Sequence, residues 1–213
     1  MPPKPTPTRI LITRHGESEH NLRTDVFMGR SPASRLTETG HVQARRLGGR
    51  LKANGGEALC PDHIICSSLP RTLETAQEIA TQTGVDSIFP EDAFWELNKG
   101  DWEGVMDRWN IPEPTRGQRD GDPFGFVYPG GESYQMVWRR AAPAFDRWVD
   151  AYPGATLLFV LHGDVMRSLL YHMIRFPPEK IEDFQTDPCA LNEFRRTNGR
   201  YMVVRLNDTG HLG

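Results

Sequence analysis

The chain has 213 residues, a length that one globular domain can account for, and its 38% hydrophobic and 25% charged residues are an ordinary balance for a soluble protein. A net charge of −3 and a pI near 6.2 exclude a general attraction for nucleic acid, and no apolar stretch approaches the roughly 20 residues that cross a bilayer. Cys60, Cys66 and Cys189 have no paired spacing, so neither a disulfide framework nor a zinc site is expected.

The chain opens with a proline-rich segment, residues 1–8, which lacks the apolar core of a signal peptide and predicts an extended, flexible tail. Three short apolar runs rich in β-branched residues then predict strands that are buried on both faces. These runs are residues 9–13, 63–66 and 156–161. Two further strands are expected at residues 189–195 and 200–206, joined by a turn at Asn198-Gly199.

Apolar residues at helical spacing predict four helices between and after the strands. They are expected from about 37 to 54–56, from 69 to 80, from 132 to 152 and from 165 to 173. Ser67 or Ser68 is the expected N-cap of the second helix, with Pro70 in its first turn. The alternation of strands and helices predicts a three-layer α/β/α sandwich around a mainly parallel sheet with an antiparallel edge strand.

Residues 9–213 are expected to form a single domain, within which one stretch departs from the pattern. Residues 105–131 are rich in Gly, Pro, Arg and Asp, which is typical of a loop insertion rather than of a second core. In α/β folds of this kind, ligands bind outside the carboxyl ends of the strands. We therefore expect the functional site at that end of the sheet, with residues 105–131 lying over it.

Four side chains of one chemical character follow the predicted buried strands directly. Arg14 and His15 come after the first strand, Arg71 after the second and His162 after the third. Strand ends of a parallel sheet meet at one edge, and the following helices direct their N-terminal N–H groups to the same edge. Two guanidinium groups and two imidazoles form a pocket for a dianion, most naturally a phosphate group.

These residues lie in segments that resemble the motifs of a known family. Residues 11–21, LITRHGESEHN, resemble the signature that opens the histidine phosphatase (phosphoglycerate mutase-like) superfamily. Further segments resemble later motifs in the family's order: 36–44, 67–76, 96–104, 130–133, 160–163 and 206–212. The resemblance spans nearly the whole chain and implies a phosphatase of this superfamily.

The resemblance also implies a mechanism that needs no metal and no cofactor. One ring nitrogen of neutral His15 attacks phosphorus, and Glu96 protonates the leaving oxygen and later activates water. The phosphoryl oxygens are bound by Arg14, Arg71 and His162, with Asn21 and the backbone N–H of Gly163 as neutral donors. We expect a small phosphate ester as the substrate, without naming it.

Several assignments have competitors. Glu17, Glu103 and Asp164 compete with Glu96 for the role of the acid. Four basic residues have two interpretations: they bind a second anionic group of the substrate, or they belong to a solvated, charged loop. These residues are Lys99, Arg108, Arg116 and Arg119. Met28 stands where the family often has a polar residue, so the pocket is expected to differ there. The other histidines are interpreted as surface or packing residues: His20, His41, His63, His172 and His211.

Three rival functions stay open. A mutase would return the phosphoryl group to another hydroxyl, although the stretch 97–100 lacks the Arg and Tyr expected of phosphoglycerate mutases. A metallohydrolase would use His15, Glu17, His162 and Asp164 as ligands. A non-catalytic module would only bind phosphate esters. We expect a cytoplasmic protein with no nucleic-acid or membrane partner, and the sequence allows a homodimer.

Overall fold

The computed structural model describes residues 6–52 and 59–213, and it contains one six-stranded sheet in the order β3-β2-β4-β1-β5-β6. β2, β4 and β1 pair in parallel, and β3 extends the parallel part beside β2. β5 pairs antiparallel with β1, and β6 antiparallel with β5. The strands are β1 (Thr8–Arg14), β2 (His63–Cys66), β3 (Ile88–Pro90), β4 (Thr156–Leu161), β5 (Leu191–Thr197) and β6 (Arg200–Asp208).

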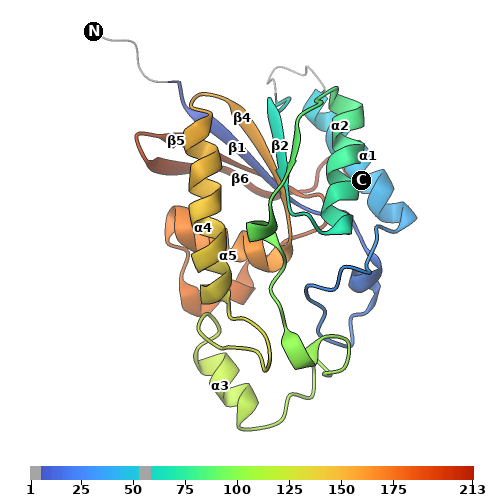
Figure 1. Cartoon of the computed structure of the whole chain (residues 1–213), viewed down its shortest axis with the longest axis vertical. Coiled ribbons are helices and arrows are strands. Elements are labelled where there is room, and N and C mark those ends of the chain that lie inside the picture. The colour runs from blue at the N-terminus through green and yellow to red at the C-terminus, as the bar shows by residue number, and fades with distance from the viewer. Residues whose placement is uncertain (1–5, 53–58) are drawn as a thin grey trace.

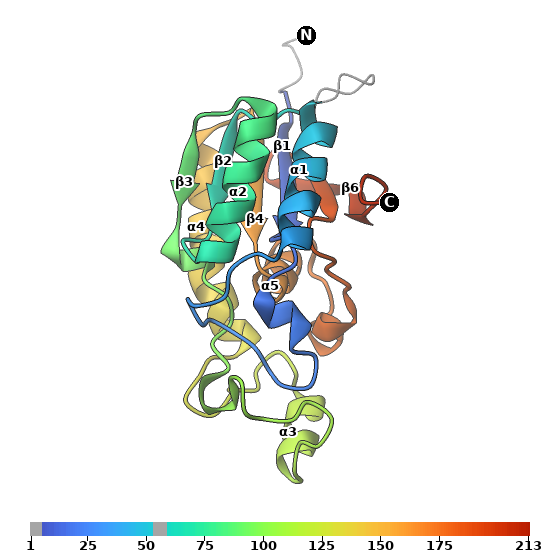
Figure 2. The ribbon, with the colours of Figure 1, turned by 90° about the vertical axis from the view of Figure 1, so that its right-hand side faces the viewer.

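Helices cover both faces of this sheet (Figures 1 and 2). α1 (Glu38–Lys52) and α2 (Pro70–Thr83) lie on one face, and α4 (Tyr134–Ala151) and α5 (Gly163–Ile174) lie on the other. The short helix α3 (Thr115–Gly121) lies beyond the sheet, at the lower end of the molecule in both views. No helix in the described part of the chain is both long and apolar enough to span a membrane.

The alternation of side chains along β1 divides the core into two. Ile10 and Ile12 face the α4 and α5 layer, where they pack in one cluster with Phe145. Leu11 points the other way and packs with Leu47 of α1 in a second cluster. Both faces of the central strands are therefore buried, which explains why their sequences are continuously apolar rather than alternating. The predicted three-layer sandwich is confirmed.

Some details differ from the sequence predictions. Thr8 is already part of β1, so the segment predicted as a tail is shorter than residues 1–8, and residues 1–5 lie outside the described residues. The expected end of the first helix at 54–56 also falls outside them. Leu69, not Ser67 or Ser68, is the N-cap of α2, with Pro70 in the first turn as expected. β3 and α3 were not predicted, whereas the two strands expected around Asn198-Gly199 are present as β5 and β6, and both are antiparallel.

The stretch 105–131 contains α3 and begins with a segment fixed to residues 25–27. Val26 and Asp107 form an isolated antiparallel bridge. Phe27 donates from its backbone N–H to the Met106 carbonyl at 3.2 Å, and Arg108 to the Asp25 carbonyl at 3.0 Å. These bonds hold the start of the stretch beside the loop that follows the first strand.

Candidate active site

A cavity of about 420 Å³ opens where β1 and β4 end. Its lining is drawn from segments that are far apart in the sequence, as expected for the carboxyl edge of a parallel sheet. Six of the seven residues predicted for the site line it: Arg14, His15, Asn21, Arg71, Glu96 and Gly163. The seventh, His162, is fully buried against His15, with their ring centroids 5.2 Å apart. The structure therefore brings the predicted set together.

The His15 ring is fixed by hydrogen bonds at both nitrogens. Nδ1 lies 2.7 Å from the carbonyl oxygen of Gly16, which can only accept, so Nδ1 carries the proton. Nε2 lies 3.2 Å from Nε of Arg71, which can only donate, so Nε2 is the unprotonated nitrogen. Burial, followed by the charges of Arg71 and Arg14, holds the His15 pKa well below its ordinary value. His15 is thus a neutral imidazole whose unprotonated Nε2 accepts from Arg71, and both residues line the cavity.

Two guanidinium groups supply positive charge at His15. Arg71 is 2% exposed and is anchored by the backbone carbonyls of Ser31, at 3.2 Å, and Gly29, at 3.1 Å. Burial lowers the Arg71 pKa to about 10, which leaves the side chain charged at neutral pH. Arg14 donates from one terminal nitrogen to the Thr186 carbonyl at 2.9 Å, while its buried Nε has no hydrogen-bond partner among the described residues. Such a buried donor is expected to have a ligand.

The second imidazole, that of His162, has no protein partner at either ring nitrogen among the residues that the structure describes. It precedes α5 as the N-cap residue, with extended backbone. Burial, followed by the charge of Arg71, lowers the His162 pKa well below its ordinary value, so the ring is neutral. Buried polar atoms are rarely left unsatisfied, so an oxygen-rich ligand in the cavity is the natural partner.

Asn21 and Gly163 can add neutral donors. The Asn21 side-chain oxygen accepts from the backbone N–H and the hydroxyl group of Ser18, at 2.9 and 3.0 Å, which leaves the amide nitrogen as the group available to the cavity. Gly163 is the first residue of α5, where backbone N–H groups are unpaired within the helix and favour an anion. Both positions suit a phosphoryl group.

Glu96 lies in surroundings that raise the pKa of its carboxyl group. Its Oε1 accepts from the Leu97 N–H at 2.8 Å, and its Oε2 lies 3.5 Å from the Asp164 N–H. Burial, followed by the negative charge of Asp164, raises the Glu96 pKa above its ordinary value. A carboxyl group that is protonated closer to neutral pH can serve as a general acid.

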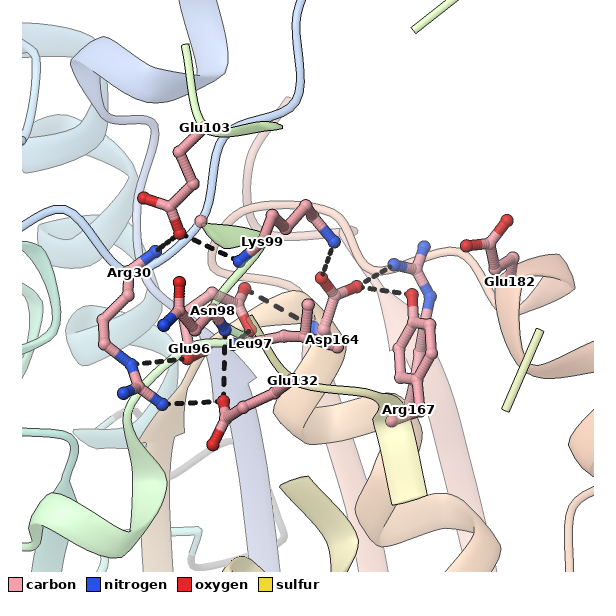
Figure 3. A network of polar contacts seen from close by, with 12 residues as sticks. Arg30, Glu96, Leu97, Asn98, Lys99, Glu103, Glu132, Asp164, Arg167 and Glu182 are labelled. Carbon is pink, nitrogen blue, oxygen red and sulfur yellow. Dashed lines mark hydrogen bonds and ion pairs between the residues drawn. The ribbon is translucent and has the colours of Figure 1, made fainter. Parts of the chain in front are cut away.

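A buried polar network lies beside Glu96 (Figure 3). Asp164 accepts from Lys99 Nζ at 2.8 Å, from the Tyr134 hydroxyl at 2.7 Å and from Arg167 at 2.9 Å. Burial opposes ionisation of Asp164, but the charges of Lys99 and Arg167 outweigh it and hold the Asp164 pKa below its usual range. The sequence reasoning missed Tyr134 and Arg167, since no local motif announces a contact between α4 and α5.

The other candidates for the acid are engaged elsewhere. Asp164 is ionised within its network and therefore carries no proton to donate. Glu103 accepts from the backbone N–H groups of Arg30 and Lys99, at 2.8 and 3.0 Å. Glu17 accepts from the Thr37 hydroxyl group at 2.7 Å, next to the start of α1. Neither Glu17 nor Glu103 lines the cavity, so the geometry favours Glu96.

The remaining basic candidates separate into two groups. Lys99, Arg108 and Arg119 line the cavity. Arg116 does not line it, because its Nε donates to the Ile111 carbonyl at 3.3 Å and pairs with Glu113. Met28 also lines the cavity, where its thioether offers no hydrogen-bond donor.

One histidine interpreted as a surface or packing residue lies in the site. His20 lines the cavity, and burial together with the charge of Arg71 lowers its pKa. Its position within the motif 11–21 that carries His15, in the short 3₁₀ helix Glu19–Leu22, was the signal that could have found it. The other four are not in the lining: His41, His63, His172 and His211.

The structure also bears on the ligands that a metallohydrolase would need. Among residues 6–52 and 59–213, no three or more His, Cys, Asp or Glu side chains are grouped so as to hold a metal ion. The carboxylates of Glu17 and Asp164, which that rival needs, are bonded to Thr37 and to Lys99.

The residues of the cavity lie within a stretch that matches a known protein family. The sequence pattern of the histidine phosphatase superfamily (branch 1) matches residues 10–209. The chain belongs to this superfamily. The family resemblance of the motifs is thereby confirmed.

Curated relatives of this superfamily member carry different functional names. The bifunctional protein Rv2228c of Mycobacterium tuberculosis is 30% identical over 210 residues, covering 97% of this chain and 56% of the relative. The chain thus spans about half the length of that curated relative. The 2,3-bisphosphoglycerate-dependent phosphoglycerate mutase of Cytophaga hutchinsonii is 31% identical over 198 residues, covering 87% of each chain.

Solved structures share the fold over nearly the whole chain. Bacillus stearothermophilus YhfR superposes with a TM-score of 0.83 at 28% identity, covering 97% of this chain and 100% of its own. A phosphoserine phosphatase of Entamoeba histolytica in complex with phosphoserine gives 0.82 at 24% identity, with the same coverage. The second likeness concerns the fold alone. A protein named as a mutase and a structure named as a phosphatase are thus among those that this chain resembles.

Proposed function

We propose that the protein is a metal-independent phosphomonoester hydrolase that acts on a small phosphorylated metabolite through a phosphohistidine intermediate at His15. One observation carries the proposal: the unprotonated Nε2 of His15 lies beside Arg71, and Glu96 lines the same cavity. This arrangement holds a nucleophile, positive charge for the transferred group and a carboxyl group of raised pKa around one space.

In the first step, His15 Nε2 attacks phosphorus as the bond from phosphorus to the ester oxygen breaks. Arg14, Arg71 and neutral His162 bind the phosphoryl oxygens and stabilise the charge of the transition state. Glu96 gives its proton to the departing oxygen, which leaves as an alcohol. The proton on His15 Nδ1 stays on that nitrogen, hydrogen-bonded to the Gly16 carbonyl, so the phosphorylated ring keeps its orientation.

In the second step, water replaces the alcohol and attacks the phosphohistidine. The carboxylate of Glu96, formed in the first step, takes a proton from that water. Phosphate leaves, His15 Nε2 regains its lone pair and Glu96 regains its proton. Every proton moves between Glu96, the ester oxygen and water.

A mutase is the second candidate, and the relative from Cytophaga hutchinsonii favours it. Hydrolysis is preferred because residues 97–100 lack the Arg and Tyr expected of phosphoglycerate mutases. The test supplies 3-phosphoglycerate, with and without 2,3-bisphosphoglycerate, and measures free phosphate and 2-phosphoglycerate in the same sample. Free phosphate without the isomer supports the hydrolase, whereas isomer formation faster than phosphate release establishes the mutase.

We place this activity in the cytoplasm and on small-molecule esters. The three cysteines are free thiols in the structure, which agrees with a reducing compartment. The cavity is a pocket lined largely by charged side chains, which suits a compact polar ester.

A further inference from the structure

The cavity is more basic than a single phosphate group requires. Besides Arg14 and Arg71, its lining includes five basic side chains: Arg23, Lys99, Arg108, Arg119 and Arg167. The acidic residues in the lining are Glu96, Asp164 and Glu182. Because the whole chain carries a net charge of −3, this positive excess is local to the cavity.

Three of these cations converge on one aromatic ring. The ring of Phe27 has its centroid 5.4 Å from the Arg108 guanidinium carbon, and 5.9 Å from both that of Arg119 and Lys99 Nζ. The three side chains come from separate parts of the sequence, and the 4% exposed Phe27 also lines the cavity. We call Lys99, Arg108 and Arg119 the distal cluster.

The ion pairs of the described residues do not cancel this charge. Lys99 and Arg167 share the single carboxylate of Asp164, which leaves one positive charge over. Arg119 pairs with Glu182 and with the more exposed carboxylate of Asp120. No carboxylate in the described ranges lies within ion-pair distance of Arg108, whose backbone is nevertheless fixed to the Asp25 carbonyl at 3.0 Å.

Gathering like charges around one ring raises the free energy of the empty cavity, because they repel one another and Lys99, 7% exposed, is partly removed from water. A bound anion would relieve this repulsion. Solvation of a charged loop accounts for Arg116, which points elsewhere, but does not account for three cations meeting inside one cavity.

We propose that the distal cluster binds a second anionic group of the substrate, so that the substrate class is a small phosphomonoester carrying a carboxylate or a second phosphate. This rests on the proposed function, which places the reacting phosphoryl group at His15. Arg108 acts here as a specificity residue, since it has no other anionic partner in the described structure.

The test measures binding by calorimetry to a His15→Ala protein, which cannot turn the ligands over. Two ligand pairs differ by one anionic group each: 3-phosphoglycerate against glycerol 3-phosphate for a carboxylate, and fructose 1,6-bisphosphate against fructose 6-phosphate for a second phosphate. We expect the more anionic member of at least one pair to bind roughly tenfold more tightly or better, the scale of one charged hydrogen bond. The pair that shows the preference identifies the group.

Arg108→Gln in the same protein should reduce that preference by roughly tenfold and leave the binding of the less anionic member of the pair unchanged. Arg116→Gln is the matched control, because it removes the same charge from the same stretch but from outside the cavity. Equal effects of the two variants, or no preference in either pair, would overturn the distal cluster as a binding site.

A second measurement separates this inference from the proposed function. The protein with His15 intact is assayed for phosphate release from the same four esters and from p-nitrophenyl phosphate, with and without Arg108→Gln. Turnover of all esters without any preference refutes the distal cluster alone. If the more anionic ligands bind preferentially but no ester releases phosphate, the proposed hydrolase is refuted and the distal cluster is retained. If the protein binds none of the four ligands, both proposals are refuted.

Discussion

His15 is held by two hydrogen bonds of opposite sense, and this decides which nitrogen can react. The Gly16 carbonyl requires a proton on Nδ1, and the Arg71 guanidinium requires a lone pair on Nε2. In the proposed mechanism, Arg71 therefore orients Nε2 before substrate arrives and binds the phosphoryl group afterwards. Its own fork is aligned by the carbonyls of Gly29 and Ser31.

Glu96 is expected to matter only where the leaving group needs a proton. Glu96→Gln should slow hydrolysis of an alkyl phosphate by roughly 10²–10⁴-fold and that of p-nitrophenyl phosphate far less, because nitrophenolate departs unprotonated. Since burial and Asp164 raise the Glu96 pKa, the wild-type rate on alkyl esters should fall as pH rises through that pKa. Steady-state rates across pH on both esters test this.

Glu103→Gln is the control for that variant, because Glu103 bonds backbone N–H groups outside the cavity and the amide keeps an accepting oxygen. It should change the rates on the two esters by the same factor. Equal losses on both esters in Glu96→Gln would show that another group is the acid.

At the scale of elements, the loop after β1 rests directly on α1. A Cβ added at Gly40 would lie 2.0 Å from the Glu17 carbonyl oxygen, and one added at Gly16 would lie 2.5 Å from the Gly40 carbonyl oxygen. Both contacts are with backbone, which cannot rotate away. Two glycines therefore allow α1 to support the segment that begins with His15.

Gly40→Ala should destabilise the protein by about 1–3 kcal/mol, the usual cost of overpacking, and should also lower kcat by displacing the loop that carries His15. Gly49→Ala is the matched variant in the same helix, where an added Cβ meets nothing within 4 Å. It should leave kcat unchanged and stabilise the helix by up to ~1 kcal/mol. Urea unfolding measures the stability of each variant, and hydrolysis of p-nitrophenyl phosphate measures its kcat. Equal stability and equal kcat in the two variants would contradict the claim that α1 supports the loop that carries His15.

The elements that sequence predicts best are those whose burial is uniform. β1, β2 and β4 lie in the centre of the sheet, so their apolar runs stand out. β3 has three residues at the edge, none of them fully buried, and so leaves no such run. The N-cap of α2 was misplaced because Ser68 bonds Asp92 and Trp95 instead of the helix, a tertiary contact that no local pattern reveals.

The same division applies to the site. Residues that follow buried strands could be placed from the sequence, because topology alone brings Arg14, His15 and His162 to one edge. The contact of Lys99 with Asp164, 65 positions apart, depends on how the segment after β3 packs on α5. No spacing rule predicts such a contact, so the network beside Glu96 became visible only in the structure.

At the scale of the whole molecule, the cavity combines the sheet edge with loops that surround it, and side chains of the chain itself supply all the proposed chemistry. Activity should therefore persist in full after exhaustive treatment with a chelator, and added divalent metal should not increase it. The check is phosphate release from p-nitrophenyl phosphate with and without chelator. Loss on chelation with recovery on adding a divalent metal would instead support the metallohydrolase.

The central claim is that the phosphoryl group passes through His15. Rapid quenching of the enzyme with a phosphate-labelled ester should trap labelled protein whose bond is labile in acid and stable in alkali. His15→Ala should trap no label and release no phosphate, because no other side chain can take the place of Nε2. A phosphoenzyme stable in acid, or labelling that survives His15→Ala, would contradict the account.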